Sequence, residues 1–300
     1  MTEIVSQWPR KTRELQNHHM DSTFWNDFTF RDDDIIVSTY GKSGTTWTQQ
    51  IVSQLVFGAE DVPVNAISPW WDMRMIPPEV RQAVQAQTHR RILKTHLQAD
   101  ALLLSPKAKY LYVARDGRDV IWSMYNHHAA FKPEIFSRFN DLPGLVGPPL
   151  EPADPDIRRY FRTWLENDGE PFWSFWENTE SWWALRHLPN VKLVHFNRLK
   201  ADLEGEMRAI AAFLEIDLPE AKWPDAVRHS TFDYMKAHAD LYAPMGGSPW
   251  ESGGETFINK GTNGRWRDVL TAEESFAYEQ MALEKLGPEC AKWLATGEGG

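Results

Sequence analysis

The chain has 300 residues, of which 42% are hydrophobic, so it can bury a sizeable core, and one large domain is favoured over two small ones. The formal net charge of −10 excludes the broadly basic surface that general DNA or RNA binding requires. A single cysteine, Cys290, excludes a disulfide framework, and the chain contains no run of about 18 apolar residues that could span a bilayer. The N-terminal stretch lacks the apolar segment of a secretory signal, so we expect a cytoplasmic protein in a reducing compartment.

The first recognisable element is a buried strand at 34–39, followed by a glycine-containing turn at 41–44 and a helix. The strand is a short, nearly continuous apolar run after an acidic turn. The helix is indicated by apolar residues at helical spacing, namely Trp47, Ile51, Val52, Leu55 and Val56. The segment therefore reads as strand, turn and helix.

Three more strands are predicted, at 91–96, 110–114 and 191–196. The second of these precedes a polar turn at 115–119 and a helix, and the third precedes an amphipathic helix over 199–214. Strands that alternate with helices predict an α/β fold of P-loop-like architecture, in which helices flank a parallel sheet. Ligands in such folds bind beyond the carboxyl ends of the strands.

Two stretches rich in proline or glycine interrupt this pattern, at about 131–160 and 240–256. Both lie between core elements and have little periodicity, so we predict long surface loops within a single domain that spans residues 1–300. The stretch of about 131–175 and four tryptophans suggest a roomy, apolar entrance for a ligand; the tryptophans are Trp70, Trp71, Trp173 and Trp176.

The turn after the first strand has the composition of a phosphate cradle, Thr39-Tyr40-Gly41-Lys42-Ser43-Gly44-Thr45-Thr46-Trp47. A glycine turn at a helix N-terminus directs backbone N–H groups and partial positive charge at one point, and Lys42 adds a cation. The order is not that of a Walker A loop, in which the lysine follows the second glycine, because Lys42 precedes Gly44. An ordinary turn with a polar cap is the alternative at this point.

Two other strand ends carry residues suited to related chemistry. His96, in Lys94-Thr95-His96-Leu97, can act as a general base, although a lone histidine is more often structural. Arg115, at the start of the turn 115–119, can grip a phosphate with two donors, and Ser123 can reach the same group from the next helix. A surface cluster of ion pairs among Asp116, Arg118 and Asp119 is the alternative for this turn.

In this order and at these separations, the three motifs resemble those of the cytosolic-type sulfotransferases, which move a sulfuryl group from the nucleotide PAPS to an acceptor hydroxyl and release PAP. The resemblance implies that Lys42 contacts the bridging oxygen region of PAPS. It also implies which residues hold the 5′-phosphate, namely Ser43, Gly44, Thr45 and Thr46, and that Trp47 stacks on the adenine. The residues that match Arg115 and Ser123 bind the 3′-phosphate in that family.

A fourth segment, 257–266, resembles the one that closes over the 3′-phosphate in that family, which implies contacts from Asn259, Lys260 and Gly261. Asn259 stands where the family has arginine, so the grip on the 3′-phosphate should weaken by about 1–3 kcal/mol unless Arg265, in place of the usual aspartate, compensates.

Three further positions bear on the resemblance. Thr231 and Phe232 lie in a stretch that is similar to one contacting the adenine. Phe196 replaces a tyrosine of the family, and no role is assigned to it. The pattern as a whole is more similar to bacterial members, including mycobacterial glycolipid sulfotransferases, than to animal ones.

The resemblance therefore implies direct in-line transfer, with His96 as the base and with Lys42 and Lys94 stabilising the developing charge. The acceptor would be a small or lipid-linked molecule with a hydroxyl group, such as a phenol, a hydrophobic alcohol or a glycolipid. The oligomeric state stays open, because the short dimer motif of the family is only partly matched.

No metal is expected, because the cations supply the charge and no metal-ligand spacing is evident. The adjacent pairs His18-His19 and His127-His128 would point apart on a strand, so a joint site is not expected. Two other hypotheses remain. One is a P-loop kinase, which would need Mg²⁺ and ATP. The other is a non-catalytic module that binds a nucleotide or a glycan.

Overall fold

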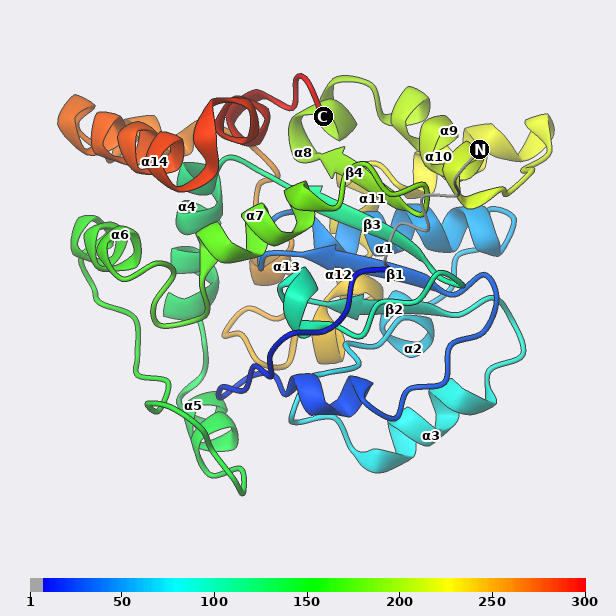
Figure 1. Ribbon diagram of the computed structural model, residues 1–300, viewed down its shortest axis with the longest axis horizontal. Helices are drawn as coiled ribbons and strands as arrows, with labels where there is room; N and C mark the ends of the chain where they lie inside the picture. Colours follow the sequence, from blue (N-terminus) through cyan, green and yellow to red (C-terminus); the bar gives the residue numbers. More distant parts are fainter. Residues whose placement is uncertain (1–7) are drawn as a thin grey trace, which may run out of the picture.

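The computed structural model describes residues 8–300, so the first seven residues of the stretch predicted not to be a secretory signal lie outside it. In this range one sheet is formed by four parallel strands: β1 (Ile35–Thr39), β2 (Ile92–Thr95), β3 (Lys109–Ala114) and β4 (Val191–His195). Their order is β2-β1-β3-β4, and Ile36 pairs with Leu93 on one side and Tyr110 on the other (Figure 1). All four predicted strands are confirmed, with ends within one residue of the prediction.

Helices cover both faces of the sheet, so the predicted α/β class is confirmed. Alternate residues such as Val37 and Val113 pack against α1 (Thr45–Val56), α9 (Leu203–Leu214) and α10 (Trp223–His229). The opposite residues, such as Ile36 and Tyr112, pack against α4 (Gly117–Ala129), α6 (Ile157–Glu166), α7 (Phe175–Ala184) and α14 (Ala272–Thr296). Burial on both faces explains why these strands are nearly continuous apolar runs.

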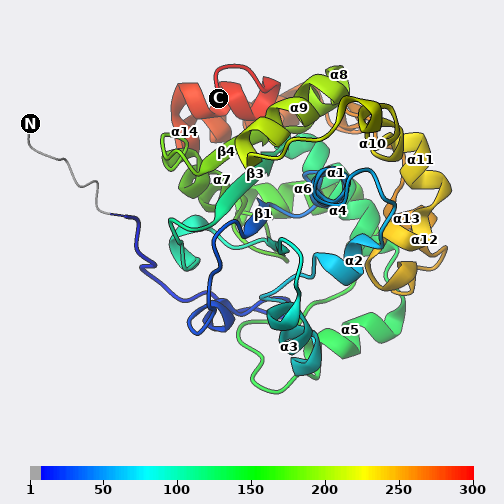
Figure 2. The same cartoon turned by 90° about the vertical axis from the view of Figure 1, so that its right-hand side faces the viewer.

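Shorter elements complete the fold (Figure 2). They are η1 (Ser22–Trp25), α2 (Val64–Ile67), α3 (Pro78–Ala86), η2 (Ala99–Ala101), α5 (Pro133–Asn140), α8 (Phe196–Ala201), η3 (Glu220–Lys222), α11 (Phe232–Ala237), α12 (Ala239–Tyr242), η4 (Pro244–Gly247), α13 (Gly254–Phe257) and η5 (Arg265–Asp268). The helix predicted over 199–214 is in fact the pair α8 and α9. The chain breaks there because the Asp202 carboxylate accepts a 2.9 Å hydrogen bond from the Gly205 N–H and caps a new helix.

The prediction of unbroken loops is wrong in part. The stretch 131–160 contains α5 and the first turn of α6. Pro133 lies in the first turn of α5, where its missing N–H is not needed, and Ile135 and Phe139 lie one turn apart and are buried. The stretch 240–256 likewise includes the end of α12, all of η4 and part of α13.

The two ends of the strands carry different kinds of polar residue. At the amino ends, the fully buried pair Arg91 and Asp34 joins the starts of β2 and β1, and Arg91 Nε lies 2.7 Å from Asp34 Oδ1. The carboxyl ends open onto the cavity described below. Within residues 8–300, no helix combines the length and apolar character that crossing a membrane would require.

Candidate functional site

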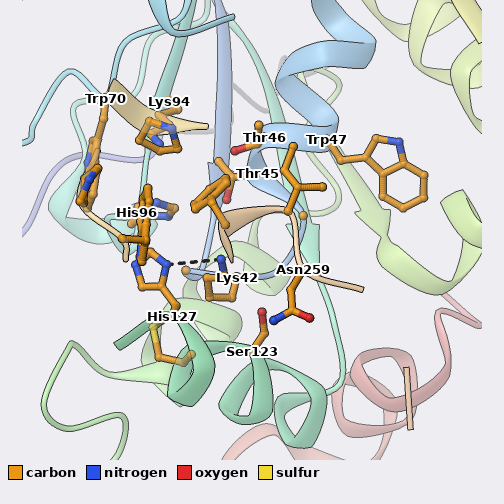
Figure 3. Close-up of a pocket in the computed structure, with 18 of the residues that line it drawn as sticks. Lys42, Thr45, Thr46, Trp47, Trp70, Lys94, His96, Ser123, His127 and Asn259 are labelled. Carbon is orange, nitrogen blue, oxygen red and sulfur yellow. Dashed lines mark hydrogen bonds between the residues drawn. The ribbon is translucent and has the colours of Figure 1, made fainter. Parts of the chain in front are cut away.

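A cavity of about 870 Å³ lies beyond the carboxyl ends of β1, β2 and β3 (Figure 3). The parallel arrangement brings these strand ends to one edge of the sheet. The cavity is lined by almost every residue singled out from the sequence: Lys42, Gly44, Thr45, Thr46, Trp47, Lys94, His96, Arg115, Ser123, Thr231, Phe232, Asn259, Lys260 and Gly261. Ser43 is the exception, because it is buried in the turn, where its N–H bonds the Tyr40 carbonyl oxygen.

The turn 41–44 leads into the N-terminus of α1 with a geometry that suits an anion. Gly44 occupies the N-cap position at φ +110° without a side-chain cap, so the first N–H groups of the helix face the cavity unbonded by the helix itself. A Cβ at Gly44 would lie 3.0 Å from the Phe196 ring, which explains the need for glycine. The Thr45 hydroxyl lies 2.6 Å from the Thr39 hydroxyl and ties the helix to β1.

The tautomer of His96 follows from its hydrogen bond. His96 Nδ1 lies 2.7 Å from the carbonyl oxygen of Thr39, which can only accept, so Nδ1 carries the proton and the Nε2 lone pair is left available. The Asn178 amide donates to the His96 carbonyl oxygen at 3.0 Å and fixes the turn. Burial, together with the nearby Lys94 and Lys42 ammonium groups, lowers the pKa of His96 to about 3, so the ring is neutral at neutral pH.

The two lysines are held in an electrostatically unfavourable setting. Burial, followed by the charges of Arg115 and Lys94, lowers the pKa of Lys42 to about 7. Burial lowers the pKa of Lys94 to about 8, against the opposing effect of Asp72. A polyanionic ligand would favour the charged form of both lysines. This end of the cavity is therefore suited to a ligand with several negative charges.

Asp72 does not line the cavity but holds residues next to Lys94 and His96 in place, a role that the sequence did not reveal. Its buried carboxylate accepts hydrogen bonds from Trp25 Nε1 at 2.7 Å, from the Thr95 hydroxyl at 2.5 Å and from Trp70 Nε1. Burial raises the pKa of Asp72 to about 6. The Trp70 ring held in this way meets the His96 ring edge to face, with centroids 4.5 Å apart.

Arg115 links the third motif to the fourth. Its guanidinium lies over the Phe196 ring at 4.3 Å and donates from Nη2 to Asn263 Oδ1 at 2.7 Å and to the Thr262 carbonyl oxygen at 3.0 Å. The Asp119 carboxylate also accepts a 2.7 Å bond from the Gly264 N–H. The segment 259–264 is therefore fastened at two points, to Arg115 after β3 and to Asp119 in the first turn of α4, which no local sequence pattern indicates.

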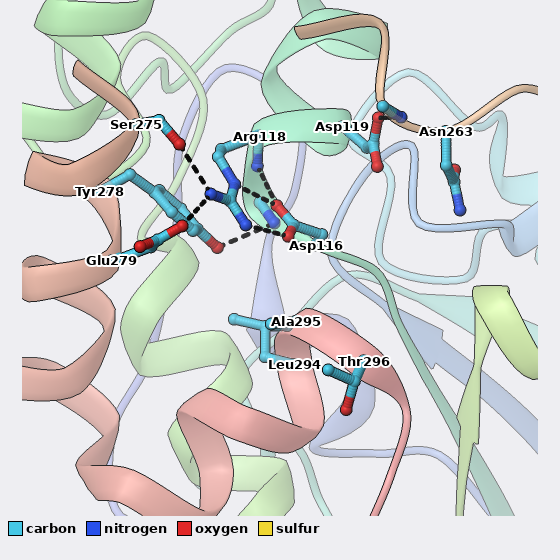
Figure 4. A network of polar contacts seen from close by, with 12 residues as sticks. Asp116, Arg118, Asp119, Asn263, Ser275, Tyr278, Glu279, Leu294, Ala295 and Thr296 are labelled. Atoms are coloured by element: carbon cyan, nitrogen blue, oxygen red, sulfur yellow. Dashed lines mark hydrogen bonds and ion pairs between the residues drawn. The ribbon is translucent and has the colours of Figure 1, made fainter. Parts of the chain in front are cut away.

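Arg118 belongs to the scaffold (Figure 4), but the surface cluster of ion pairs offered as the alternative for this turn is not what forms: Asp116, Arg118 and Asp119 are buried, and Asp119 accepts a hydrogen bond from the Gly264 N–H instead of pairing with Arg118. Its guanidinium pairs with Asp116 at 2.7 Å and with Glu279 of α14 at 2.5 Å, and it lies over the Trp266 ring at 4.1 Å. These contacts hold α14 and η5 against the start of α4.

Two more cations line the cavity: Arg265, which the sequence offered as a replacement for the missing arginine, and Lys200, to which the sequence gave no role. Arg265 lines the cavity with its guanidinium 5.2 Å from the ring of Trp122, the residue that precedes Ser123. Lys200 lines it too and donates to the Gly261 carbonyl oxygen at 2.7 Å. Positive charge is therefore present near Asn259, where the resemblance led us to expect an arginine.

The other half of the cavity is apolar. Its wall includes Met73, Met75, Ile76, Met124, Phe131, Ile135, Phe139, Phe172, Trp173 and Trp250. Of the four tryptophans predicted at an entrance, Trp70 and Trp173 line the cavity, whereas Trp71 and Trp176 are buried elsewhere in the core, so that prediction is half wrong. Helix α5 supplies part of this wall.

The histidine pairs do not lie on strands, so the premise that their side chains point apart as they would on a strand is wrong. His127 and His128 belong to α4, and His127 lines the cavity. The rings of His18 and His19 contact each other through their Nδ1 atoms, and His19 lines the apolar half. Among residues 8–300, no group of three or more His, Cys, Asp or Glu side chains is placed to hold a metal ion.

A helix N-terminus, clustered cations and a neutral histidine beside an apolar compartment are the features of an α/β-enzyme site that suits an anionic ligand next to an apolar one. The Sulfotransferase domain family matches residues 32–288. Glycolipid sulfotransferase from Mycobacterium bovis is 32% identical over 93% of both chains, and Sulfotransferase 1A1 from Rattus norvegicus is 29% identical over 84% of both. The chain belongs to the sulfotransferase family.

Solved structures share the fold. Mouse sulfotransferase SULT7A1 complexed with PAP has a TM-score of 0.68 at 20% identity, with 91% of each chain covered. Retinol dehydratase in a complex with retinol and PAP has a TM-score of 0.67 at 21% identity, with 89% of this chain and 86% of that chain covered. This likeness therefore extends over about nine tenths of this chain.

Proposed function

We propose that residues 1–300 act as one sulfotransferase domain that moves a sulfuryl group from PAPS to an acceptor hydroxyl and releases PAP. One observation carries the proposal: the Lys42, Lys94 and His96 side chains line one cavity together with a large set of apolar side chains. The names of the relatives and the PAP complexes of the structural neighbours support it. A cytoplasmic location remains a prediction.

The donor would lie along the polar part of the cavity. The first turn of α1, with the hydroxyls of Thr45 and Thr46, would hold the 5′-phosphosulfate, and Trp47 and Phe232 would hold the adenine. The 3′-phosphate would meet the residues around Arg115 and Ser123, including Lys260 and Gly261. Arg265 and Lys200 would then supply the charge that Asn259 lacks.

The transfer itself would need one proton acceptor and two cations. The acceptor hydroxyl gives its proton to His96 Nε2, its oxygen forms a bond to sulfur, and the bond between sulfur and the bridging oxygen of PAPS breaks in line. Lys42 and Lys94 neutralise the charge that develops on the bridging and sulfuryl oxygens. The negative charge of the donor would also raise the pKa of His96 in the complex, which makes the ring a better base.

The acceptor would be a lipid-linked or otherwise hydrophobic alcohol. The methionine and aromatic side chains of the apolar wall can bury a large apolar body beside His96. The relative from Mycobacterium bovis is named for a glycolipid acceptor. We therefore place glycolipids and hydrophobic alcohols ahead of simple phenols.

Calorimetric titration with PAP in the absence of Mg²⁺ tests the donor site. We expect micromolar affinity, which falls by at least about tenfold in Lys42→Ala and Arg115→Ala proteins because each loses a charge-assisted contact. An Arg228→Ala protein, altered at an exposed residue outside the cavity wall, is the control and should bind normally. Binding of ATP–Mg²⁺ in place of PAP would discard the proposal in favour of a kinase.

Turnover of PAPS with a panel of glycolipids and hydrophobic alcohols tests the base. A His96→Ala protein should keep its affinity for PAP and lose turnover by about 10²–10⁴-fold. Near-normal turnover in that protein would refute the assignment of His96. PAP binding by the unaltered protein with no turnover on any acceptor would favour the non-catalytic module.

A further inference from the structure

A second histidine faces the proposed transfer point, and the mechanism above does not use it. His127 lies on α4 one turn after Ser123, so both side chains leave the helix on the same face. The imidazole lines the cavity, and its Nδ1 lies 3.5 Å from Lys42 Nζ (Figure 3). This distance is at the outer limit of a hydrogen bond.

The imidazole is held in place by aromatic neighbours from other parts of the chain. The ring centroids of Phe131, Trp250 and Phe257 lie 4.8, 5.0 and 5.9 Å from that of His127. Phe257 also faces Lys42, whose Nζ lies 4.2 Å from the centre of that ring. The ammonium group therefore sits between an imidazole nitrogen and an aromatic face.

Lys42 has little other support at its charged end. Among residues 8–300, His127 is the only residue whose side chain lies within hydrogen-bonding distance of the ammonium. The charges closest to it, Arg115 and Lys94, repel it. Because an ammonium group can only donate, His127 Nδ1 must be the acceptor, and the imidazole must be neutral with its proton on Nε2.

We propose that His127 is a positioning residue for Lys42: through Nδ1, His127 accepts a hydrogen bond from the Lys42 ammonium and holds this cation between the polar and apolar parts of the cavity. The inference rests on the proposed sulfotransferase function. A hydrogen bond to the charged form of a group favours that form, so His127 keeps Lys42 ready for an anionic donor against the effect of burial. Burial and the neighbouring Lys42 lower the pKa of His127 well below its ordinary value, which keeps the imidazole neutral as this role requires.

The competing explanation is that His127 is only part of the aromatic wall. Two substitutions separate the explanations because they keep opposite halves of the side chain. His127→Asn retains an oxygen near the position of Nδ1 but removes most of the ring. His127→Phe retains a ring that can pack against Phe131, Trp250 and Phe257 but removes the acceptor.

The probe is PAP, because its affinity can be measured without knowing the acceptor. Calorimetric titrations from about pH 5.5 to about pH 8.5 would compare both variants with the unaltered protein, and thermal melting would verify folding. Other titratable or charged groups face the pair from the neighbouring elements and are unchanged in all three proteins: Lys94 of β2, His96 after β2, Arg115 after β3, His128 of α4 and His19 before η1.

A positioning role predicts a pH-dependent defect in His127→Phe and rescue in His127→Asn. At about pH 7 the Phe variant should bind PAP about tenfold more weakly than the unaltered protein, and the two affinities should converge at low pH, where Lys42 is charged in both. The Asn variant should stay within about threefold throughout.

Three results would overturn the inference: a Phe variant that binds like the unaltered protein, a defect of equal size at every pH, or equal defects in both variants. Failure of the unaltered protein to bind PAP would instead refute the proposed function on which the inference rests.

Discussion

Binding of PAP should draw a proton from solvent at mildly alkaline pH. The reason is the pKa of Lys42, which burial and the charges of Arg115 and Lys94 lower to about 7. At about pH 8 such a group is about nine-tenths deprotonated, and the phosphates of PAP favour its charged form, so binding should restore about 0.9 proton. Lys94, with a pKa of about 8, can add about half a proton at the same pH. At about pH 6 both lysines are already charged, and their contribution to the uptake should fall to about 0.1 proton.

The uptake is measured by calorimetry in buffers that differ in their enthalpy of ionisation, because the slope of the apparent binding enthalpy gives the number of protons taken up. Lys42→Met should remove most of the uptake at about pH 8. Lys285→Met, which alters an exposed lysine on α14, should leave it unchanged. A binding enthalpy that is independent of buffer at this pH, or an unchanged slope in Lys42→Met, would refute the reasoning.

Three further changes should have distinct effects. Gly44→Ala places a Cβ 3.0 Å from the Phe196 ring at φ +110°, so we expect about 1–3 kcal/mol of strain and weaker PAP binding, measured by thermal melting and calorimetry. Asp34→Ala leaves the buried Arg91 guanidinium without its carboxylate and should lower the free energy of unfolding by about 3–5 kcal/mol in urea titrations. Arg265→Ala should weaken PAP binding by about tenfold while leaving the affinity for 5′-AMP, which lacks the 3′-phosphate, unchanged.

For each of these substitutions, one result would contradict the prediction. Wild-type stability and PAP affinity in Gly44→Ala would show that the turn tolerates a Cβ. A loss below about 1 kcal/mol in Asp34→Ala would show that the Arg91 charge finds other compensation. Arg267→Ala, altered at an exposed neighbour of Arg265, is the matched control, and equal losses for PAP and 5′-AMP in Arg265→Ala would remove Arg265 from the 3′-phosphate site.

The sequence by itself determined the sheet and most of the polar half of the site. Strands buried on both faces must be apolar runs, so the segments 34–39, 91–96, 110–114 and 191–196 stood out within one residue of their true ends. In a parallel sheet, residues that follow different strands meet at one edge, which agrees with the single site that the resemblance to the sulfotransferase family implied for Lys42, His96 and Arg115. The strands follow from local patterns, whereas the site follows from one rule of topology together with the resemblance.

The tertiary structure alone decided which side chains complete the cavity, because these contacts join residues far apart in the chain. Helix α5 forms in a proline-rich stretch since Ile135 and Phe139 are buried against the core, which outweighs the weak local signal. The packing of α4 turns His127 toward Lys42, 85 residues away, and the folded chain brings Asn263 to Arg115, 148 residues away. The direction of a side chain on a helix depends on which face of the helix packs against the core, and no pattern within α4 determines that face. The position of the segment 259–264 likewise depends on contacts with distant residues.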